Sequence, residues 1–145
     1  MVPTVWGRIQ TRIFLMAMVG GPVTALITLV LPLSDPWAKR YQATFVVLAA
    51  VTVIGIGWEL VYHLLMQWRW EKDWPTLFGL LTLVPEGILV GALARDGQLP
   101  WLPGPVPVGA FVIQFLVVWV AVWLVANGPM RVPFIRWRFN GGRLV

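Results

Sequence analysis

The chain has 145 residues, of which 59% are hydrophobic and 12% charged, and its formal net charge is +5. Average soluble domains carry about 25% charged residues, and a domain this short cannot bury so much apolar side chain. Composition therefore excludes an ordinary soluble domain, a disordered tail and a fibrous repeat, and it indicates an integral membrane protein. The absence of cysteine excludes a disulfide framework and thiolate chemistry.

Four stretches are long and apolar enough to cross a bilayer, which takes about 20 residues. They cover residues 13–33, 43–66, 76–94 and 109–130. We therefore predict a single all-α membrane domain over residues 1–145, folded as a bundle of four transmembrane helices. Arg8 and Arg12 precede the first stretch and are assigned to an N-terminal tail. This stretch is longer than a signal-peptide core and lacks a small-residue cleavage site, so we expect it to be retained as a span.

Basic residues outside the spans are unevenly distributed. Eight lie on the side of the two termini and the loop between the second and third spans, and three lie on the opposite side. The positive-inside rule then places both termini in the cytoplasm. Arginine outnumbers lysine in a chain rich in alanine, glycine and proline, which favours a GC-rich bacterial source and a multi-pass protein of the inner membrane.

The connections carry proline and aromatic residues. Residues 34–42 are expected to form a short outer turn, and residues 95–108, with four prolines, an extended polyproline-like cover on the outer surface. Pro22 and Pro85 are expected to kink their helices. Gly87 and Gly91 form a GxxxG pair, which allows close approach to another helix of the bundle or to another subunit.

Ionisable groups within the spans are the candidate functional residues, because they are costly in hydrocarbon. Glu59 and His63 are four apart on one helical face, and Glu86 lies at a comparable depth in the next span. We expect an intramembrane polar cluster, whose members are Glu59, His63, Glu86, Thr82 and Gln114. It could be structural, could carry protons or cations, or could resemble a metal ligand set. No strong metal or cofactor motif is present, so we expect neither a metal nor a cofactor.

Enzymatic function is disfavoured by the residues that are missing. The only serine, Ser34, lies in the outer loop, whereas the only histidine, His63, lies near the inner face. These two residues cannot form a nucleophile–base pair within one chain. We therefore expect a protein that is not an enzyme, with a membrane enzyme acting on lipid as a weaker alternative.

Tryptophan-rich and arginine-rich segments are candidate partner surfaces. Trp68, Trp70 and Trp74 lie in the loop between the second and third spans, where they either anchor the loop to lipid or dock a protein partner. Trp119 and Trp123 form a ridge on the fourth span, which is expected to pack against a partner helix or lipid.

The C-terminal tail, residues 131–145, shows an alternating pattern. Trp137 falls on one side of an expected extended strand, with Arg136 and Arg138 on the other, and residues 140–142 are expected to form a turn. Such a tail either lies on anionic lipid headgroups or adds to a partner's sheet. We expect no nucleic-acid binding, since four arginines held at a membrane make a small footprint.

These features predict a non-enzymatic subunit or scaffold that assembles with other proteins of a larger membrane complex. The alternative is an oligomeric proton- or ion-coupled transporter or channel that uses Glu59, His63 and Glu86. The expected partners are the lipid bilayer and either other membrane-protein subunits or further copies of the chain.

Overall fold

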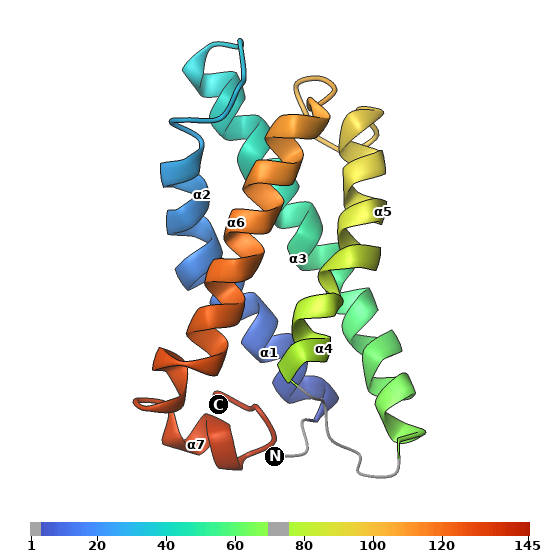
Figure 1. Cartoon of the computed structure of the whole chain (residues 1–145), viewed down its shortest axis with the longest axis vertical. Helices are drawn as coiled ribbons and strands as arrows, with labels where there is room; N and C mark the ends of the chain where they lie inside the picture. The colour runs from blue at the N-terminus through green and yellow to red at the C-terminus, as the bar shows by residue number, and fades with distance from the viewer. Residues whose placement is uncertain (1–3, 70–75) are drawn as a thin grey trace.

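The computed structural model describes residues 4–69 and 76–145, and the regular structure within these ranges is entirely helical. Four helices are long and apolar enough to cross a membrane, as predicted: Val5–Ile27, Trp37–Gln67, Thr76–Arg95 and Val108–Arg131. They run alternately up and down, so that both termini lie at one end of the bundle (Figure 1). We call this the termini end, and we call the opposite end, which holds residues 28–36 and 96–107, the loop end.

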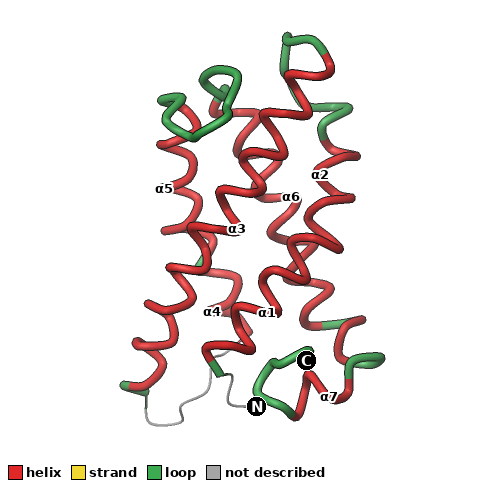
Figure 2. The backbone as a smooth tube through the Cα atoms, turned by 180° about the vertical axis from the view of Figure 1, so that it is seen from behind, coloured by secondary structure: helices red, strands yellow, loops and turns green. Residues whose placement is uncertain are grey.

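Short irregularities divide three of the four spans. The interruption between α4 and α5 is visible as a short loop segment in Figure 2. The first span comprises α1 (Val5–Leu15), a π-helical turn η1 (Met16–Gly20) and α2 (Gly21–Ile27). The second is the continuous α3 (Trp37–Gln67), and the third comprises α4 (Thr76–Leu81) and α5 (Leu83–Arg95). The fourth comprises α6 (Val108–Asn127) and a 3₁₀ turn η2 (Pro129–Arg131), and the short α7 (Ile135–Phe139) follows it.

The four spans pack as a ring. The first span contacts the second through α1 and α3, the second contacts the third through α3 and α5, and the third contacts the fourth through α5 and α6. The ring closes where η1 packs against α6. The first and third spans therefore face each other across the bundle, which matters for the ion pairs described below.

The predicted boundaries of the first span were wrong. The helix begins at Val5, because the Thr4 hydroxyl caps it by accepting from the Gly7 N–H at 3.0 Å, and it ends at Ile27. Arg8 and Arg12 therefore lie inside the helix and not in a tail. An arginine is tolerated there because its charge is paired within the bundle, as shown in the next subsection.

Both predicted proline sites coincide with a helix irregularity. Pro22 follows the π-helical turn, where the Gly21 N–H bonds to the Met16 carbonyl. Pro85 lies four residues after Leu81, and the third span is interrupted at Thr82. A proline cannot donate to the carbonyl four residues earlier and its ring clashes with it, so the preceding turn is distorted.

The loop-end half of the bundle is filled. Its core combines apolar side chains such as Val47, Val90 and Phe111 with a small polar layer. In that layer the Thr28 hydroxyl donates to the Thr44 hydroxyl at 2.9 Å, and the Gln114 amide donates to the Thr44 carbonyl at 2.7 Å. Gln114 thus lies apart from the acidic residues with which it was predicted to cluster.

Residues 96–107 do not form the extended cover that was predicted. They form a compact loop, because Leu99 and Val106 are buried in the core and the Val106 N–H bonds to the Ala94 carbonyl at 2.9 Å. Trp101, at the tip, is 82% exposed. Apolar side chains between the prolines anchor this loop to the bundle.

The predicted strand in the C-terminal tail was also wrong. Ile135–Phe139 is helical, and the expected turn at 140–142 is present. Trp137 is buried, and its indole N–H donates to the Thr11 hydroxyl at 2.7 Å. The tail returns along α1, where the Thr11 hydroxyl donates to the Gly142 carbonyl at 2.9 Å. The tail is therefore an intramolecular element, which is stabilised by burial of an aromatic side chain and by hydrogen bonds.

Gly87 and Gly91 lie against α6 of the same chain. A Cβ atom added at Gly91 would approach the Phe111 ring to 2.8 Å, and one added at Gly87 would approach the Phe115 ring to the same distance. Gly57, in contrast, has no neighbouring atom within 4 Å of such a Cβ. Because Gly87 and Gly91 have no side chains, α5 can lie close to the stacked Phe111 and Phe115 rings of α6.

We predict that Gly91→Ala lowers the free energy of unfolding in detergent by about 1–3 kcal/mol, because the buried ring must shift. The matched control Gly57→Ala should be neutral or slightly stabilising, since alanine is the better helix former. Thermal unfolding of the two variants measures the difference. Equal stability of the two would contradict the assigned packing of α5 on α6.

A buried arginine–glutamate network and its cavity

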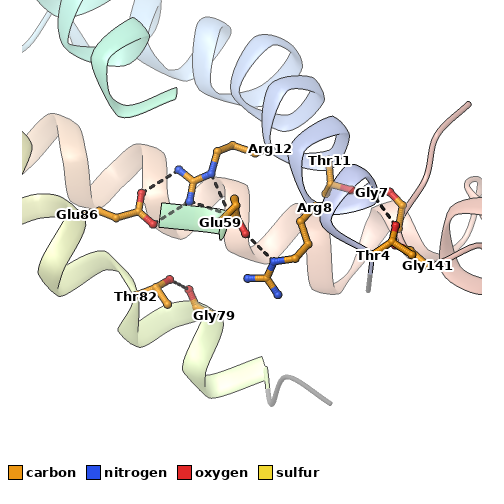
Figure 3. Close-up of polar contacts among 11 residues, drawn as sticks. Thr4, Gly7, Arg8, Thr11, Arg12, Glu59, Gly79, Thr82, Glu86 and Gly141 are labelled. Carbon is orange, nitrogen blue, oxygen red and sulfur yellow. Dashed lines mark hydrogen bonds and ion pairs between the residues drawn. The ribbon is translucent and has the colours of Figure 1, made fainter. Parts of the chain in front are cut away.

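An ion network lies in the termini-end half of the bundle (Figure 3). Its centre is Arg12 on α1, whose side chain is only 8% exposed. Arg12 Nη1 donates to Glu86 Oε2 and Nη2 donates to Glu86 Oε1, both at 2.8 Å. Such a two-pronged arginine–carboxylate pair is among the strongest hydrogen-bonded arrangements in proteins.

Glu59 on α3 is the second acceptor of Arg12. The Arg12 Nε atom donates to Glu59 Oε1 at 2.9 Å, and the Arg8 Nε atom donates to Glu59 Oε2 at 2.7 Å. Arg8 and Arg12 are four apart and share one face of α1, so both reach the same carboxylate. The two positive charges of the arginines balance the two negative charges of Glu59 and Glu86. Each of the four carboxylate oxygens accepts a hydrogen bond from a guanidinium group.

The helices make room for this network. Gly55 lies one turn before Glu59 on α3, and a Cβ atom there would overlap the Arg12 guanidinium group. On the opposite side, the Arg12 Cζ atom lies 5.8 Å from the centre of the Trp119 ring. Glycine on one helix and an indole face on another therefore bound the guanidinium group, and the indole adds a cation–π contact.

The network connects three spans. Arg12 belongs to the first span, Glu59 to the second and Glu86 to the third, and the first and third spans face each other across the ring. The Arg12–Glu86 pair thus joins helices that are not neighbours in the ring. Breaking it would leave a carboxylate with a 1% exposed side chain unpaired, which is strongly unfavourable.

A cavity of about 240 Å³ lies beside the network. Arg8, Arg12 and Glu59 form its charged wall. The facing wall is mainly aromatic and apolar, and its residues on α6 and the tail are Trp119, Val122, Trp123, Ala126, Asn127, Trp137 and Gly142. We call this space the termini-side cavity, because its lining extends from Gly7 and Gly142 at the termini end up to Trp119.

Some predicted cluster residues do not join the network. His63 lies one turn beyond Glu59, but its Nε2 atom lies 3.2 Å from the Gln67 amide nitrogen, and its Nδ1 atom is buried without a hydrogen-bond partner among the described residues. Thr82 lines the cavity, and its hydroxyl donates to the Gly79 carbonyl at 2.9 Å. Glu59 and Glu86, which were predicted to lie in contact, are bridged by the Arg12 guanidinium group.

The predicted partner anchors are distributed differently. Trp119 is buried inside the bundle, and the Trp123 indole N–H donates to the Thr76 carbonyl at 3.1 Å, so this ridge faces the chain's own cavity. Trp68 is 86% exposed, whereas Trp70 and Trp74 lie outside the described residues. The remaining predicted anchors, Arg136 and Arg138, are exposed on α7.

Within residues 4–69 and 76–145, no group of three His, Asp or Glu side chains is placed to hold a metal ion. The polar chemistry of the site is therefore that of guanidinium, carboxylate, hydroxyl and indole groups. Comparison of the chain with known protein families, curated proteins and solved structures found no match.

We predict that Arg12→Met lowers the free energy of unfolding by about 3–5 kcal/mol, because it leaves Glu86 unpaired and removes one partner of Glu59. The double variant Arg12→Met/Glu86→Met should recover much of this loss, since Glu59 keeps Arg8 as its partner. Thermal unfolding in detergent measures both variants. If Arg12→Met unfolds like the wild type, the network is not what joins these helices.

Proposed function

We propose that this chain is a small membrane transporter that binds a polar solute in the termini-side cavity and moves it past the arginine–glutamate network. The observation that carries the proposal is a buried, charge-balanced network, three members of which (Arg8, Arg12 and Glu59) line a 240 Å³ cavity. This volume is near the lower end of small-molecule sites and has room for several water molecules. Intramembrane charges that face a cavity commonly mark a solute or ion pathway.

The shape of the bundle supports the same proposal. Beyond the cavity lies a void of about 10 Å³ between Val51, Gln114 and Trp119, near the size that holds one water molecule. The packed core of the loop-end half lies next to this void, on the side away from the cavity. A solute at the network would thus be reached from the termini end and be separated from the loop end by a closed layer, as one half of an alternating-access cycle requires.

The network would be the moving part of this cycle. Arg12 holds the first, second and third spans together through two carboxylates, so any rearrangement that opens the loop-end half must exchange or break these pairs. The proline-linked irregularities at η1 and Thr82 lie in the first and third spans, where bending would separate Arg12 from Glu86. In this proposal coupling to protons or ions proceeds through Arg12, Glu59 and Glu86 and does not involve His63.

The chain lacks cysteine, so single cysteines can test the cavity. In reconstituted vesicles, Ala126→Cys in the cavity should react with a charged, membrane-impermeant thiol reagent added on either side in turn. The control Ala110→Cys, in the packed loop-end half, should react far more slowly. Reaction of Ala126→Cys from one side alone, or from neither, would contradict transport.

We further propose that the termini lie in the cytoplasm and that the membrane is the bacterial inner membrane. The excess of arginine over lysine in the composition supports the bacterial source, and the count of basic residues near the helix ends supports the orientation. With Arg8 and Arg12 set aside because both are paired with Glu59 inside the bundle, five described basic residues remain at the termini end (Arg69, Arg131, Arg136, Arg138 and Arg143) against three at the loop end (Lys39, Arg40 and Arg95). In intact cells Gly104→Cys should then react with impermeant reagent. Its protection, together with labelling of Gln67→Cys, would invert the orientation.

A second candidate function is a subunit that assembles with other membrane proteins. Trp68, at the end of α3, is 86% exposed and favours this alternative, because exposed tryptophans often anchor protein interfaces. The GxxxG pair and Trp137 were predicted from the sequence as surfaces for a partner. In the structure they make contacts within the chain.

If Trp68 anchors a partner, Trp68→Ala should lower the affinity for that co-purifying partner at least ~30-fold, as for a central anchor worth ~2 kcal/mol. Trp68→Phe should lower this affinity less, because it keeps an aromatic ring. The stability of the isolated protein should not change, because the side chain is exposed. An unchanged pull-down by Trp68→Ala would remove this candidate.

A further inference from the structure

A groove of about 460 Å³ runs between α5 and α6 on the outside of the bundle, away from the termini-side cavity. The two helices lie side by side in the loop-end half (Figure 1). Gly87 and Gly91 form the α5 side of its floor, and Phe111 and Phe115 form the α6 side. With the exception of Arg95, the residues that line it are apolar.

The length of the groove matches one leaflet of a bilayer. Its lining on α5 extends from Leu83 to Arg95, which corresponds to about 18 Å at ~1.5 Å per residue. The hydrocarbon core of a bilayer is ~30 Å thick, so one leaflet contributes ~15 Å. The apolar part of the groove thus spans the depth that a single acyl chain occupies, and its Arg95 end lies at the loop end of the bundle.

Arg95 gives the groove a charged end. It is the last residue of α5, and its guanidinium group forms no hydrogen bond or ion pair with the residues that the structure describes. Guanidinium groups bind phosphate oxygens in a two-pronged geometry, and the phosphates of a bilayer lie at the depth where the hydrocarbon ends. The groove therefore combines an apolar channel of leaflet length with a phosphate-binding group at its outer end.

We propose that this groove is a phospholipid site, in which an acyl chain lies along Gly87 and Gly91 and the phosphate binds Arg95. A second transmembrane helix is a poorer fit. The glycines that would allow such a helix to approach are already in contact with Phe111 and Phe115. This site is independent of the proposed transport function.

Native mass spectrometry of the full chain, stripped of lipid in mild detergent, tests the proposal by titration. The probes are phosphatidylglycerol and a diacylglycerol with the same acyl chains but no phosphate. Arg95→Gln should weaken phosphatidylglycerol binding about tenfold or more, the scale of a hydrogen bond to a charged group. The same variant should leave diacylglycerol binding unchanged. The control Arg143→Gln removes another exposed arginine, at the termini end, and should change the binding of neither lipid.

A steric pair tests the apolar part of the groove. Ala92 lines the groove, so Ala92→Trp should fill it and abolish binding of both lipids. The control Ala49→Trp places the same side chain on an exposed face of α3, where it should have no effect. In vesicles, a phosphatidylglycerol with a photoreactive acyl chain should crosslink to α5 and α6.

Three results would overturn the proposal. The first is equal loss of binding in Arg95→Gln and Arg143→Gln, and the second is crosslinking spread evenly over the four spans. The third is a disulfide between two copies of Ala92→Cys in vesicles, which would assign the groove to a contact between copies of the chain.

Discussion

A guanidinium group buried within a helix bundle must be paired, and the fold of this chain depends on how Arg12 meets that requirement. Its side chain is only 8% exposed, so its donors have to find acceptors inside the bundle. Glu59 and Glu86 provide them from two other spans, and Arg12 thereby joins the first and third spans, which the ring of helix contacts leaves apart. Among apolar helices the hydrophobic effect does not select one arrangement in lipid, so these interhelical pairs help to specify how three of the four helices are arranged.

Several other features follow from that arrangement. Gly55 keeps α3 clear of the guanidinium group, and Trp119 closes its other side. Long polar side chains that converge from α1 and α3, opposite the small and aromatic residues of α6, leave the termini-side cavity unfilled. The loop-end half has no such charges and packs into a dense core around Val47, Val90 and Phe111. The two halves of the bundle therefore differ because the buried ion pairs of the described residues lie in one of them, and this asymmetry underlies the proposed transport cycle.

The number and helical nature of the spans were predictable, since length and hydropathy decide them. The acidic residues of the site were predictable too, because a carboxylate in a span is unusual in itself. Arg12 was missed, since an arginine just before an apolar stretch resembles a cytoplasmic flank. A signal was nevertheless present: Glu59 and Glu86 needed cations, the spans as predicted offered only His63, and Arg8 and Arg12 are spaced to lie on one helical face. The prediction of a strand in the C-terminal tail was wrong for another reason. Alternation over five residues at Ile135–Phe139 is too short to separate strand from helix, and burial of Trp137 decides the outcome.

The most direct test of this account is a distance measurement between Arg12 and Glu86 in a bilayer. Solid-state NMR on vesicles that contain the chain with ¹⁵N-labelled arginine side chains and ¹³C-labelled glutamate carboxyls reports nitrogen–carbon dipolar couplings. With hydrogen bonds of 2.8 Å to both Glu86 oxygens, the Glu86 carboxyl carbon should show strong dephasing by arginine nitrogen, and Arg12→Met should abolish it. A Glu86 carboxyl that shows no arginine coupling in the wild type would contradict the arrangement of helices on which the site, the cavity and the proposed function all depend.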